Sequence, residues 1–293
     1  MKIAIIGGTG YLGKGFIAYL NHNNIYDYKI LSRGYNKIID KSKYIKCDIE
    51  DISSLNRALK NIDVVIDFVG ILKEKGQVTY ESVHVRGMRN IVKASKENKV
   101  KQIIYISALG TRKNAVSMYH KTKYQAEEIL KSSGINYTII RPGFIFSEDD
   151  ISINIIAKTI KNLHIFPLFN YGKYKLRLIY KEDLYYIILN CIGKINHYNK
   201  LYSVGENKEY TYRELFKKIS EIENTFLITI PIPKFIVLIG SKIIGIINSV
   251  PISYQTALML FEDNTCSLKF KDDFKEIELH SFEEEFRKYV NKI

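Results

Sequence analysis

The chain has few cysteines, and this shortage excludes two ways of building a small protein. Only Cys47, Cys191 and Cys266 are present among the 293 residues, and no two of them form a Cys-x-x-Cys pair. No histidines are clustered at the spacing of metal ligands. The sequence therefore argues against a disulfide framework and a structural metal site, and it fits a reducing, cytoplasmic compartment.

The chain also lacks the run of about 18 apolar residues that a membrane-spanning helix requires. The apolar start, Met1–Ile6, meets glycines at once, so it is predicted to be a buried strand rather than a signal peptide. The longest apolar stretch, Phe235–Val250, contains Lys242 and follows Pro231 and Pro233, which suit a helix entrance. For residues 231–250 three alternatives stay open: packing within the chain, a protein partner or self-association, and a peripheral membrane interface.

Acidic residues are fewer than basic ones, 31 against 44, and the formal net charge is +13. The lysines are spread along the whole chain without a dense basic run. This pattern predicts a solvated basic surface rather than nucleic-acid binding. The apolar fraction of 46% and the charged fraction of 26% are those of an ordinary globular protein.

Strands and helices are predicted to alternate through the first half of the chain. This order predicts an α/β fold of the Rossmann type, a doubly wound parallel sheet with helices on both faces. The predicted strands are residues 2–6, 28–32, a short one ending at 47–48, 63–70, 102–107 and 137–141, and the predicted helices are 11–21, 51–60, 79–98 and 117–133.

The alternation fades beyond about residue 145. Residues 146–181 are expected to be irregular, followed by a helix over 181–192, a strand over 201–204 and a helix over 211–222. We therefore predict a Rossmann domain over 1–145 and a smaller C-terminal lobe for a substrate or partner over 146–293, partly interleaved with the first.

A glycine-rich segment, Gly7-Gly8-Thr9-Gly10-Tyr11-Leu12-Gly13, joins the first strand to the first helix. Gly7 permits a sharp turn, Gly10 permits a close approach of the backbone to a pyrophosphate, and Gly13 permits close packing of helix on sheet. The helix N-terminus presents N–H groups and a partial positive charge to phosphates. In this context the segment predicts a dinucleotide-binding domain.

The residues at the end of the second strand indicate which dinucleotide the site prefers. An NAD site usually has a carboxylate there for the ribose hydroxyls, but this chain has Ser32 followed by Arg33. A guanidinium can pair with a 2′-phosphate, and Lys37 can assist, so NADP(H) is favoured over NAD(H). Asp48 follows the third strand and is expected to accept a hydrogen bond from the adenine amino group, and Ile49 beside it is expected to bind the cofactor. The end of the fourth strand is expected to complete the site with Phe68, Val69 and Gly70.

Tyr119 and Lys123 lie four residues apart on a predicted helix and hence on one face of it. An ammonium near a tyrosine favours the phenolate, so such a pair beside a nicotinamide can transfer a proton while the lysine binds the ribose. Both residues are predicted to be catalytic and cofactor-binding, and Ser107 is expected to lie behind the cofactor.

With these motifs in this order, the sequence resembles the short-chain dehydrogenase/reductase superfamily in its extended or atypical form, which includes NAD-dependent epimerases and dehydratases. It looks most like the group of the dehydrogenase-like accessory subunit of respiratory complex I. The motifs that carry the resemblance are Gly7–Gly13, Val85–Asn90, Ile104–Gly110, Tyr119–Lys123 with Glu127, Arg141–Gly143 and Leu260–Asn264.

The chain departs from the superfamily pattern at one point: Leu109 occupies the place expected for the catalytic serine. The resemblance implies an oxidoreductase or epimerase for a small or nucleotide-linked substrate. The departure leaves a second reading equally open, a non-catalytic NADPH-binding protein with a structural, assembly or redox-sensing role. Residues 226–250 suggest a third, an enzyme at a membrane surface for a lipid or quinone-like substrate.

Overall fold

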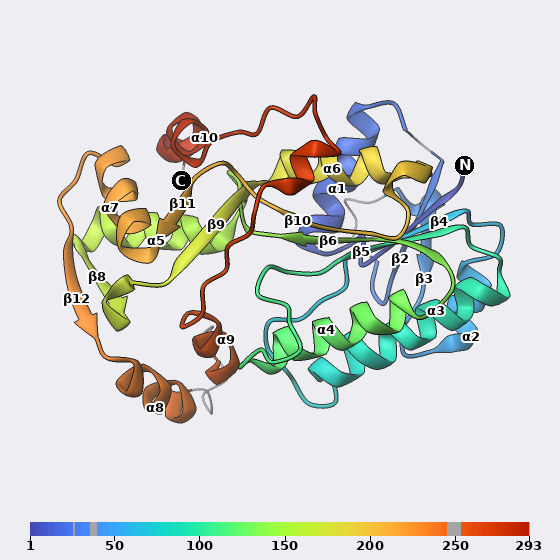
Figure 1. Ribbon diagram of the computed structural model, residues 1–293, viewed down its shortest axis with the longest axis horizontal. Helices are drawn as coiled ribbons and strands as arrows, with labels where there is room; N and C mark the ends of the chain where they lie inside the picture. The colour runs from blue at the N-terminus through green and yellow to red at the C-terminus, as the bar shows by residue number, and fades with distance from the viewer. Residues whose placement is uncertain (26, 36–39, 245–252, 293) are drawn as a thin grey trace. The chain divides into compact units, whose positions relative to one another are not determined.

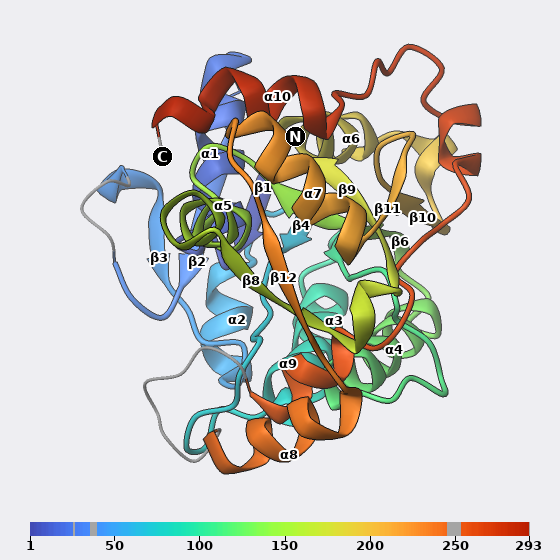
Figure 2. The ribbon, with the colours of Figure 1, turned by 90° about the vertical axis from the view of Figure 1, so that its left-hand side faces the viewer.

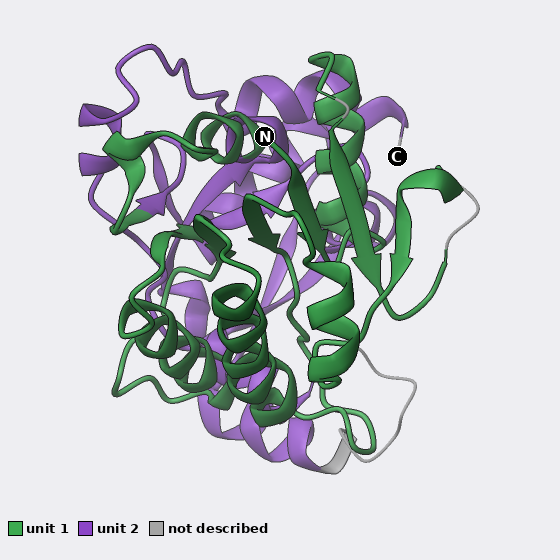
Figure 3. Ribbon diagram, turned by 90° about the vertical axis from the view of Figure 1, so that its right-hand side faces the viewer, with its two compact units in different colours: residues 1–141, 185–202 green, residues 142–184, 203–293 purple. Residues whose placement is uncertain are grey.

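The computed structural model describes residues 1–25, 27–35, 40–244 and 253–292 (Figure 1). Its chain forms two compact units, residues 1–141 with 185–202 and residues 142–184 with 203–293 (Figure 3). The chain first passes from the first unit to the second after residue 141, a few residues before the domain boundary predicted at 145. Residues 185–202 then return to the first unit.

The first unit is built on a seven-stranded sheet with the order β10-β6-β5-β4-β1-β2-β3. Neighbouring strands from β6 to β3 run parallel. In the centre, Ile5 of β1 lies between Ile30 of β2 and Ile66 of β4. The strands are β1 (Ile3–Ile6), β2 (Tyr28–Ser32), β3 (Tyr44–Lys46), β4 (Val64–Asp67), β5 (Gln102–Ile106), β6 (Asn136–Pro142) and β10 (Lys200–Val204).

Helices cover both faces of this sheet, so its central strands are apolar throughout. In Figure 1, α2 (Ile52–Ala58), α3 (Gly87–Glu97) and α4 (Met118–Lys131) lie below the sheet, and α1 (Tyr11–His22) and α6 (Lys181–Cys191) lie above it. The predicted Rossmann-type α/β fold is confirmed. The helix predicted over 79–98 consists of two parts, because a π-helical turn over Glu81–Arg86 precedes α3.

The prediction that residues 146–181 are irregular was wrong. They contain α5 (Ile151–Leu163), β8 (Ile165–Phe169) and β9 (Lys175–Tyr180), and β7 (Phe144–Phe146) precedes them. Asp150 caps α5 by accepting a hydrogen bond from the N–H of Ile153. The buried residues of α5 have helical spacing, but its many isoleucines, which have a low helix propensity, obscured the pattern. The buried residues of α5 are Ile153, Asn154, Ala157 and Ile160.

Elsewhere in the second unit the predicted elements agree better with the structure, and the helix predicted over 211–222 is present. Thr211 and Glu214 form a capping box at the start of α7 (Tyr212–Ile222), and β9 pairs with β11 (Glu209–Thr211). The unit also contains β12 (Ile228–Ile232), α8 (Lys234–Ile244), α9 (Tyr254–Met259) and α10 (Phe282–Tyr289).

The predicted helix over Phe235–Val250 is present as α8 in its first part, and residues 245–252 lie outside the described residues. Pro231 does not belong to the helix entrance as predicted. It lies in β12, opposite Leu168 of β8, in an edge strand where a missing N–H is tolerated. Within the described residues, no helix combines the length and the apolar character needed to cross a bilayer.

A buried ion pair joins three elements of the first unit. The carboxylate of Glu127 on α4 is fully buried and accepts two hydrogen bonds from Arg141 of β6, at 2.8 and 2.5 Å. It also accepts a hydrogen bond of 2.6 Å from the hydroxyl of Ser107, just after β5. Because two donors converge on one buried carboxylate, removing that carboxylate leaves the Arg141 guanidinium without its charged partner and leaves Ser107 only the weaker contact with Thr111 at 3.4 Å.

We expect Glu127→Ala to lower the free energy of unfolding by about 3–5 kcal/mol, the usual cost of breaking a buried pair from one side. Glu128→Ala is the matched control, since the neighbouring Glu128 pairs only with Lys131 at the surface. Its cost should stay below about 1 kcal/mol. Urea unfolding followed by circular dichroism measures both values, and equal losses would contradict the structural role of Glu127.

Candidate functional site

The glycine-rich loop brings the start of α1 against the end of β1. Gly7 has a positive φ of 77°, which favours glycine. A Cβ atom at Gly13 would lie 2.4 Å from the carbonyl oxygen of Gly7, so a side chain there would force the helix away from the loop. Gly10 is the N-cap residue of α1 and has no side chain to cap it. The helix end therefore offers backbone N–H groups to an anion.

A pocket of about 520 Å³ opens beside this loop. It extends past the ends of the parallel strands, where ligands of such sheets bind. Predicted site residues from four segments line it: Gly7, Thr9, Gly10, Ser32, Arg33, Asp48, Ile49, Phe68, Val69 and Gly70. All belong to the first unit, so the pocket is complete within one compact body.

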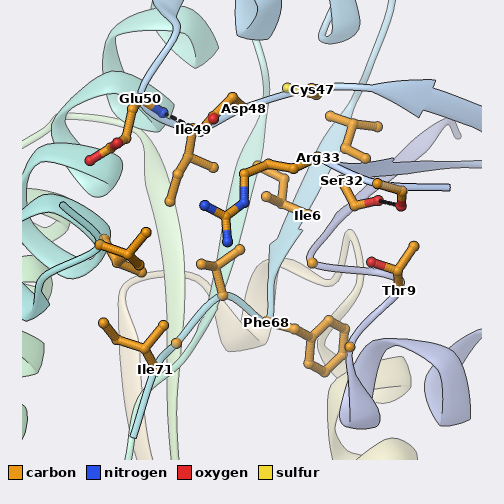
Figure 4. Close-up of a pocket in the computed structure, with 18 of the residues that line it drawn as sticks. Ile6, Thr9, Ser32, Arg33, Cys47, Asp48, Ile49, Glu50, Phe68 and Ile71 are labelled. Atoms are coloured by element: carbon orange, nitrogen blue, oxygen red, sulfur yellow. Dashed lines mark hydrogen bonds between the residues drawn. The ribbon is translucent and has the colours of Figure 1, made fainter. Parts of the chain in front are cut away.

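Arg33 is the cation of this pocket. In Figure 4 its side chain extends between Ile6 and Ile49, away from the end of β2. The hydroxyl of Ser32 donates to the carbonyl oxygen of Gly34 at 2.8 Å, which fixes the turn that carries the arginine. Among the described residues no carboxylate pairs with Arg33, so its guanidinium is available to an anionic ligand. Lys37, predicted to assist it, lies outside the described residues.

Two carboxylates also line the pocket, and both have partners. Asp48 accepts a hydrogen bond from the N–H of Glu50 at 3.0 Å. Glu50 forms an ion pair with Arg86 at 3.2 Å, and in Figure 4 its carboxylate points away from Arg33. The end of β2 therefore has a cation and a neutral hydroxyl, and the residues present fit a dinucleotide with a charged group at that place.

Lys123 lies just behind the far end of the pocket. A Cβ at Gly70 would lie 3.4 Å from the Lys123 Nζ. The ammonium donates to the carbonyl oxygen of Ile106 at 2.8 Å and lies 3.4 Å from that of Val69. Burial lowers the pKa of Lys123 to about 8, although the carboxylates of Asp67 and Glu127 oppose this shift.

Tyr119 lies one helical turn before Lys123 on α4, on the same face of the helix, and is partly buried. Burial raises the pKa of its phenol to about 12, and no ammonium offsets the rise. The ring contacts three aromatic neighbours edge-on, those of Tyr80, His84 and His120. In this arrangement Tyr119 is a neutral phenol at physiological pH and can donate a hydrogen bond.

His84 and Asp67 lie beside Lys123, and sequence reasoning missed both. The hydroxyl of Thr122 donates to the carbonyl oxygen of Met118, so the Nδ1–H of His84 donates to Thr122 at 2.8 Å. This leaves Nε2 as an acceptor for the N–H of Ile71, at 3.4 Å. Burial lowers the pKa of His84 to about 2, so the ring is neutral.

Asp67 is the last residue of β4 and is almost completely buried. Its carboxylate accepts a hydrogen bond from the N–H of Val69, and burial raises its pKa to about 6. A carboxylate at the end of an apolar strand was visible in the sequence as a signal. For His84 the only signal was a histidine on the buried face of a helix.

Other predicted site residues lie outside the pocket lining. Ser107 faces Glu127, and Leu109 is buried. The carbonyl of Leu12 accepts from Tyr185, Gly13 packs under the loop, and Tyr11 is partly exposed at the start of α1. Their predicted roles stay predictions. Residues that line the pocket and were not predicted are Ile6, Leu31, Gly34, Tyr35, Cys47, Glu50, Ile71, Val78 and Val83.

Comparison with known proteins gives one family and several relatives. Residues 7–164 match the family described as NAD(P)H-binding. The chain is 24% identical to NADH dehydrogenase (ubiquinone) 1 alpha subcomplex subunit 9, mitochondrial, of Dictyostelium discoideum, over 73% of this chain and 62% of that protein. The mouse protein of the same name is 25% identical over 83% and 66%. The chain thus spans less than two thirds of these relatives.

Proteins named as nucleotide-sugar epimerases are also similar to this chain. UDP-glucose 4-epimerase of Lactobacillus helveticus is 29% identical over 48% of this chain and 51% of that protein. A solved nucleoside-diphosphate-sugar epimerase of Staphylococcus aureus has a TM-score of 0.80 at 20% identity and covers 98% of this chain and 99% of its own. The fold is therefore that of the epimerases. The resemblance to the atypical short-chain dehydrogenase/reductase superfamily and to the complex I accessory subunit is confirmed.

The lowered pKa of Lys123 predicts a pH dependence of stability. Between pH 8 and the unfolded value of 10.5 the unfolded chain binds more protons at this residue than the folded one. The burial cost of the ammonium is therefore fully present below pH 8 and is relieved as the pH rises. Lys123→Met removes this titration, so its free energy of unfolding, relative to the wild type, should be higher at pH 7 than at pH 9.5.

The measurement is urea unfolding of both proteins at the two pH values. The difference between them should change by up to about 1.4 kcal/mol for each pH unit above 8. Lys131→Met, at a partly exposed ion pair, serves as the control. A pH-independent difference for Lys123→Met would show that its amine titrates normally.

Proposed function

We propose, because the chain belongs to the NAD(P)H-binding family, that it binds NADP(H) and acts chiefly as a cofactor-binding accessory or sensing protein. One observation carries the choice of cofactor: Arg33 extends into the pocket from the end of β2, where a neutral Ser32 replaces a carboxylate. A 2′-phosphate brings two negative charges to this guanidinium, whereas the ribose hydroxyl of NAD brings none. In this proposal Lys37 helps Arg33 to bind the 2′-phosphate.

The other residues would hold the cofactor along the pocket. The glycine loop and the start of α1 would bind the pyrophosphate, Asp48 and Ile49 the adenine, and Gly70 and Lys123 the nicotinamide ribose. The bound nicotinamide would supply hydride-transfer chemistry. The chain's contribution is an anion site at one end of the pocket and a buried ammonium at the other.

Three features support binding rather than efficient turnover. Leu109 offers no hydroxyl where the family places one, and the hydroxyl of Ser107 is already bonded to Glu127. The pKa of Tyr119 is raised to about 12, whereas a general acid or base works best with a pKa near the operating pH. The relatives named as complex I alpha subcomplex subunit 9 support a role within, or in the assembly of, a redox complex.

The second candidate is an oxidoreductase or epimerase for a nucleotide-linked substrate. The presence of Tyr119 and Lys123 on one face of α4 favours it, because these two groups are sufficient to donate and accept a proton beside a nicotinamide. The relative named UDP-glucose 4-epimerase supports the nucleotide-linked class.

The first test of this proposal is cofactor selectivity. Isothermal titration calorimetry should give a lower Kd for NADPH than for NADH. Arg33→Ala should weaken NADPH binding roughly ten- to a hundredfold, because it removes a charged hydrogen bond of about 1.5–3 kcal/mol, and should leave NADH binding nearly unchanged. Arg57→Ala, an exposed arginine on α2 outside the pocket lining, is the matched control. Equal affinity of the wild type for both cofactors refutes the assignment.

A second test separates binding from turnover. Tyr119→Phe removes one hydroxyl and should leave folding and most of the NADPH affinity intact. Lys123→Ala removes a charge and should weaken NADPH binding more. Wild-type protein should neither reduce nucleoside-diphosphate keto sugars with NADPH nor oxidise or epimerise nucleoside-diphosphate sugars with NADP⁺. Turnover that Tyr119→Phe abolishes would establish the second candidate instead.

A further inference from the structure

The second unit presents an apolar face that no part of the described chain covers. Six large apolar side chains on two consecutive elements are between 49% and 63% exposed. Single exposed side chains of this kind are ordinary, but a group on adjacent elements marks an interaction surface. The six are Phe226, Ile228 and Ile230, at and before the exposed side of β12, and Phe235, Ile236 and Ile239 on α8.

Strand pairing explains the exposure of β12. It pairs in parallel with β8 (Figure 2). The register places Ile228 beside Ile165 and Ile230 beside Pro167, and these four residues share one face because side chains alternate along a strand. On the opposite face Leu168 is buried and Phe166 packs on Phe216 of α7, with ring centroids 4.7 Å apart, whereas Pro231 of β12 is exposed. The β8 side of that face therefore belongs to the core of the unit, and the face with Ile228 and Ile230 is apolar and lies outside it.

Helix α8 continues this face in the chain. Phe235, Ile236 and Ile239 have the spacing of one helix side, while Ser241 is buried and the helix packs on α9. The exposed side therefore has bulky apolar residues where a solvated helix would have polar ones.

The segments that carry the apolar face contain lysines and no acidic residue, and the nearest carboxylate before them, that of Glu223, is paired with Lys161 of α5. The sequence has no Asp or Glu from Asn224 to Phe261, nor from Ile151 to Lys181, the stretches that supply β12, α8, α5 and β8. Lys234 and Lys242 stand at the two ends of α8, and within the described residues neither has a carboxylate partner. Their ammonium groups lie over the rings of Phe261 and Tyr254, at 5.3 and 5.0 Å.

We infer that this apolar face binds the surface of an anionic lipid bilayer. Large apolar side chains on segments that contain lysines and no carboxylates are what an interfacial segment presents to anionic headgroups and the adjoining acyl chains. A second copy of this chain would bring like charges together, since the face carries lysines and the whole chain has a net charge of +13. Charge therefore favours the lipid surface over self-association.

The test is co-sedimentation of the full chain with vesicles. One set contains phosphatidylcholine alone and the other contains phosphatidylcholine and phosphatidylserine at about three to one. We expect sedimentation with the anionic vesicles, weakened at high salt, and much less with the neutral ones. Phe235→Glu with Ile239→Glu should reduce binding at least tenfold. Ile195→Glu, at a still more exposed isoleucine of the first unit, should leave it unchanged.

Lys234→Glu with Lys242→Glu should also reduce binding and remove its salt dependence, whereas Lys96→Glu should not. Circular dichroism checks that each variant is folded. Three results would overturn the inference: no sedimentation with either vesicle, binding that the Phe235–Ile239 variant leaves intact, or a dimer in sedimentation velocity that this variant dissolves. Cofactor is absent throughout, so the outcome is independent of the proposed NADP(H) binding.

Discussion

The contact between Gly7 and Gly13 determines where the pocket lies. Because neither residue has a side chain, α1 starts directly against the turn that ends β1, and a Cβ at Gly13 would lie 2.4 Å from the carbonyl oxygen of Gly7. The start of α1, the end of β2 and the end of β4 consequently meet around one cavity. A bulkier residue at position 13 would displace the helix that supplies the anion-binding N–H groups.

Burial sets the protonation states at the inner end of this pocket. It lowers the pKa of Lys123 and raises that of Asp67, so each moves toward its neutral form, while their mutual attraction opposes both shifts. His84 is held neutral and acts as a connector between α4 and the segment after β4. These groups therefore form a polar support for the pocket wall, satisfied largely by backbone and neighbouring side chains.

Much of the first unit could be predicted because local signals agree with the fold. Apolar strands, the glycine loop and Ser117 at the start of α4 all indicate the same alternation. The second unit was harder, because α5 is rich in β-branched isoleucine and the strands β7 to β9 pair over long distances in the sequence. Neither His84 nor Asp67 could be assigned from the sequence, since their environment depends on contacts between elements far apart in the chain.

The two ends of the pocket are formed by different parts of the chain. This affects how cofactor binding and turnover depend on one another. Arg33 follows β2 and needs only the first strands and the glycine loop to be in place. Tyr119 and Lys123 come from α4 and Ser107 follows β5, and the Glu127–Arg141 pair joins α4 to Ser107 and β6. Substitution of a single hydroxyl, as at Leu109, can therefore impair turnover without disturbing the anion site. Cofactor binding can accordingly persist in a member of this fold in which chemistry has been lost.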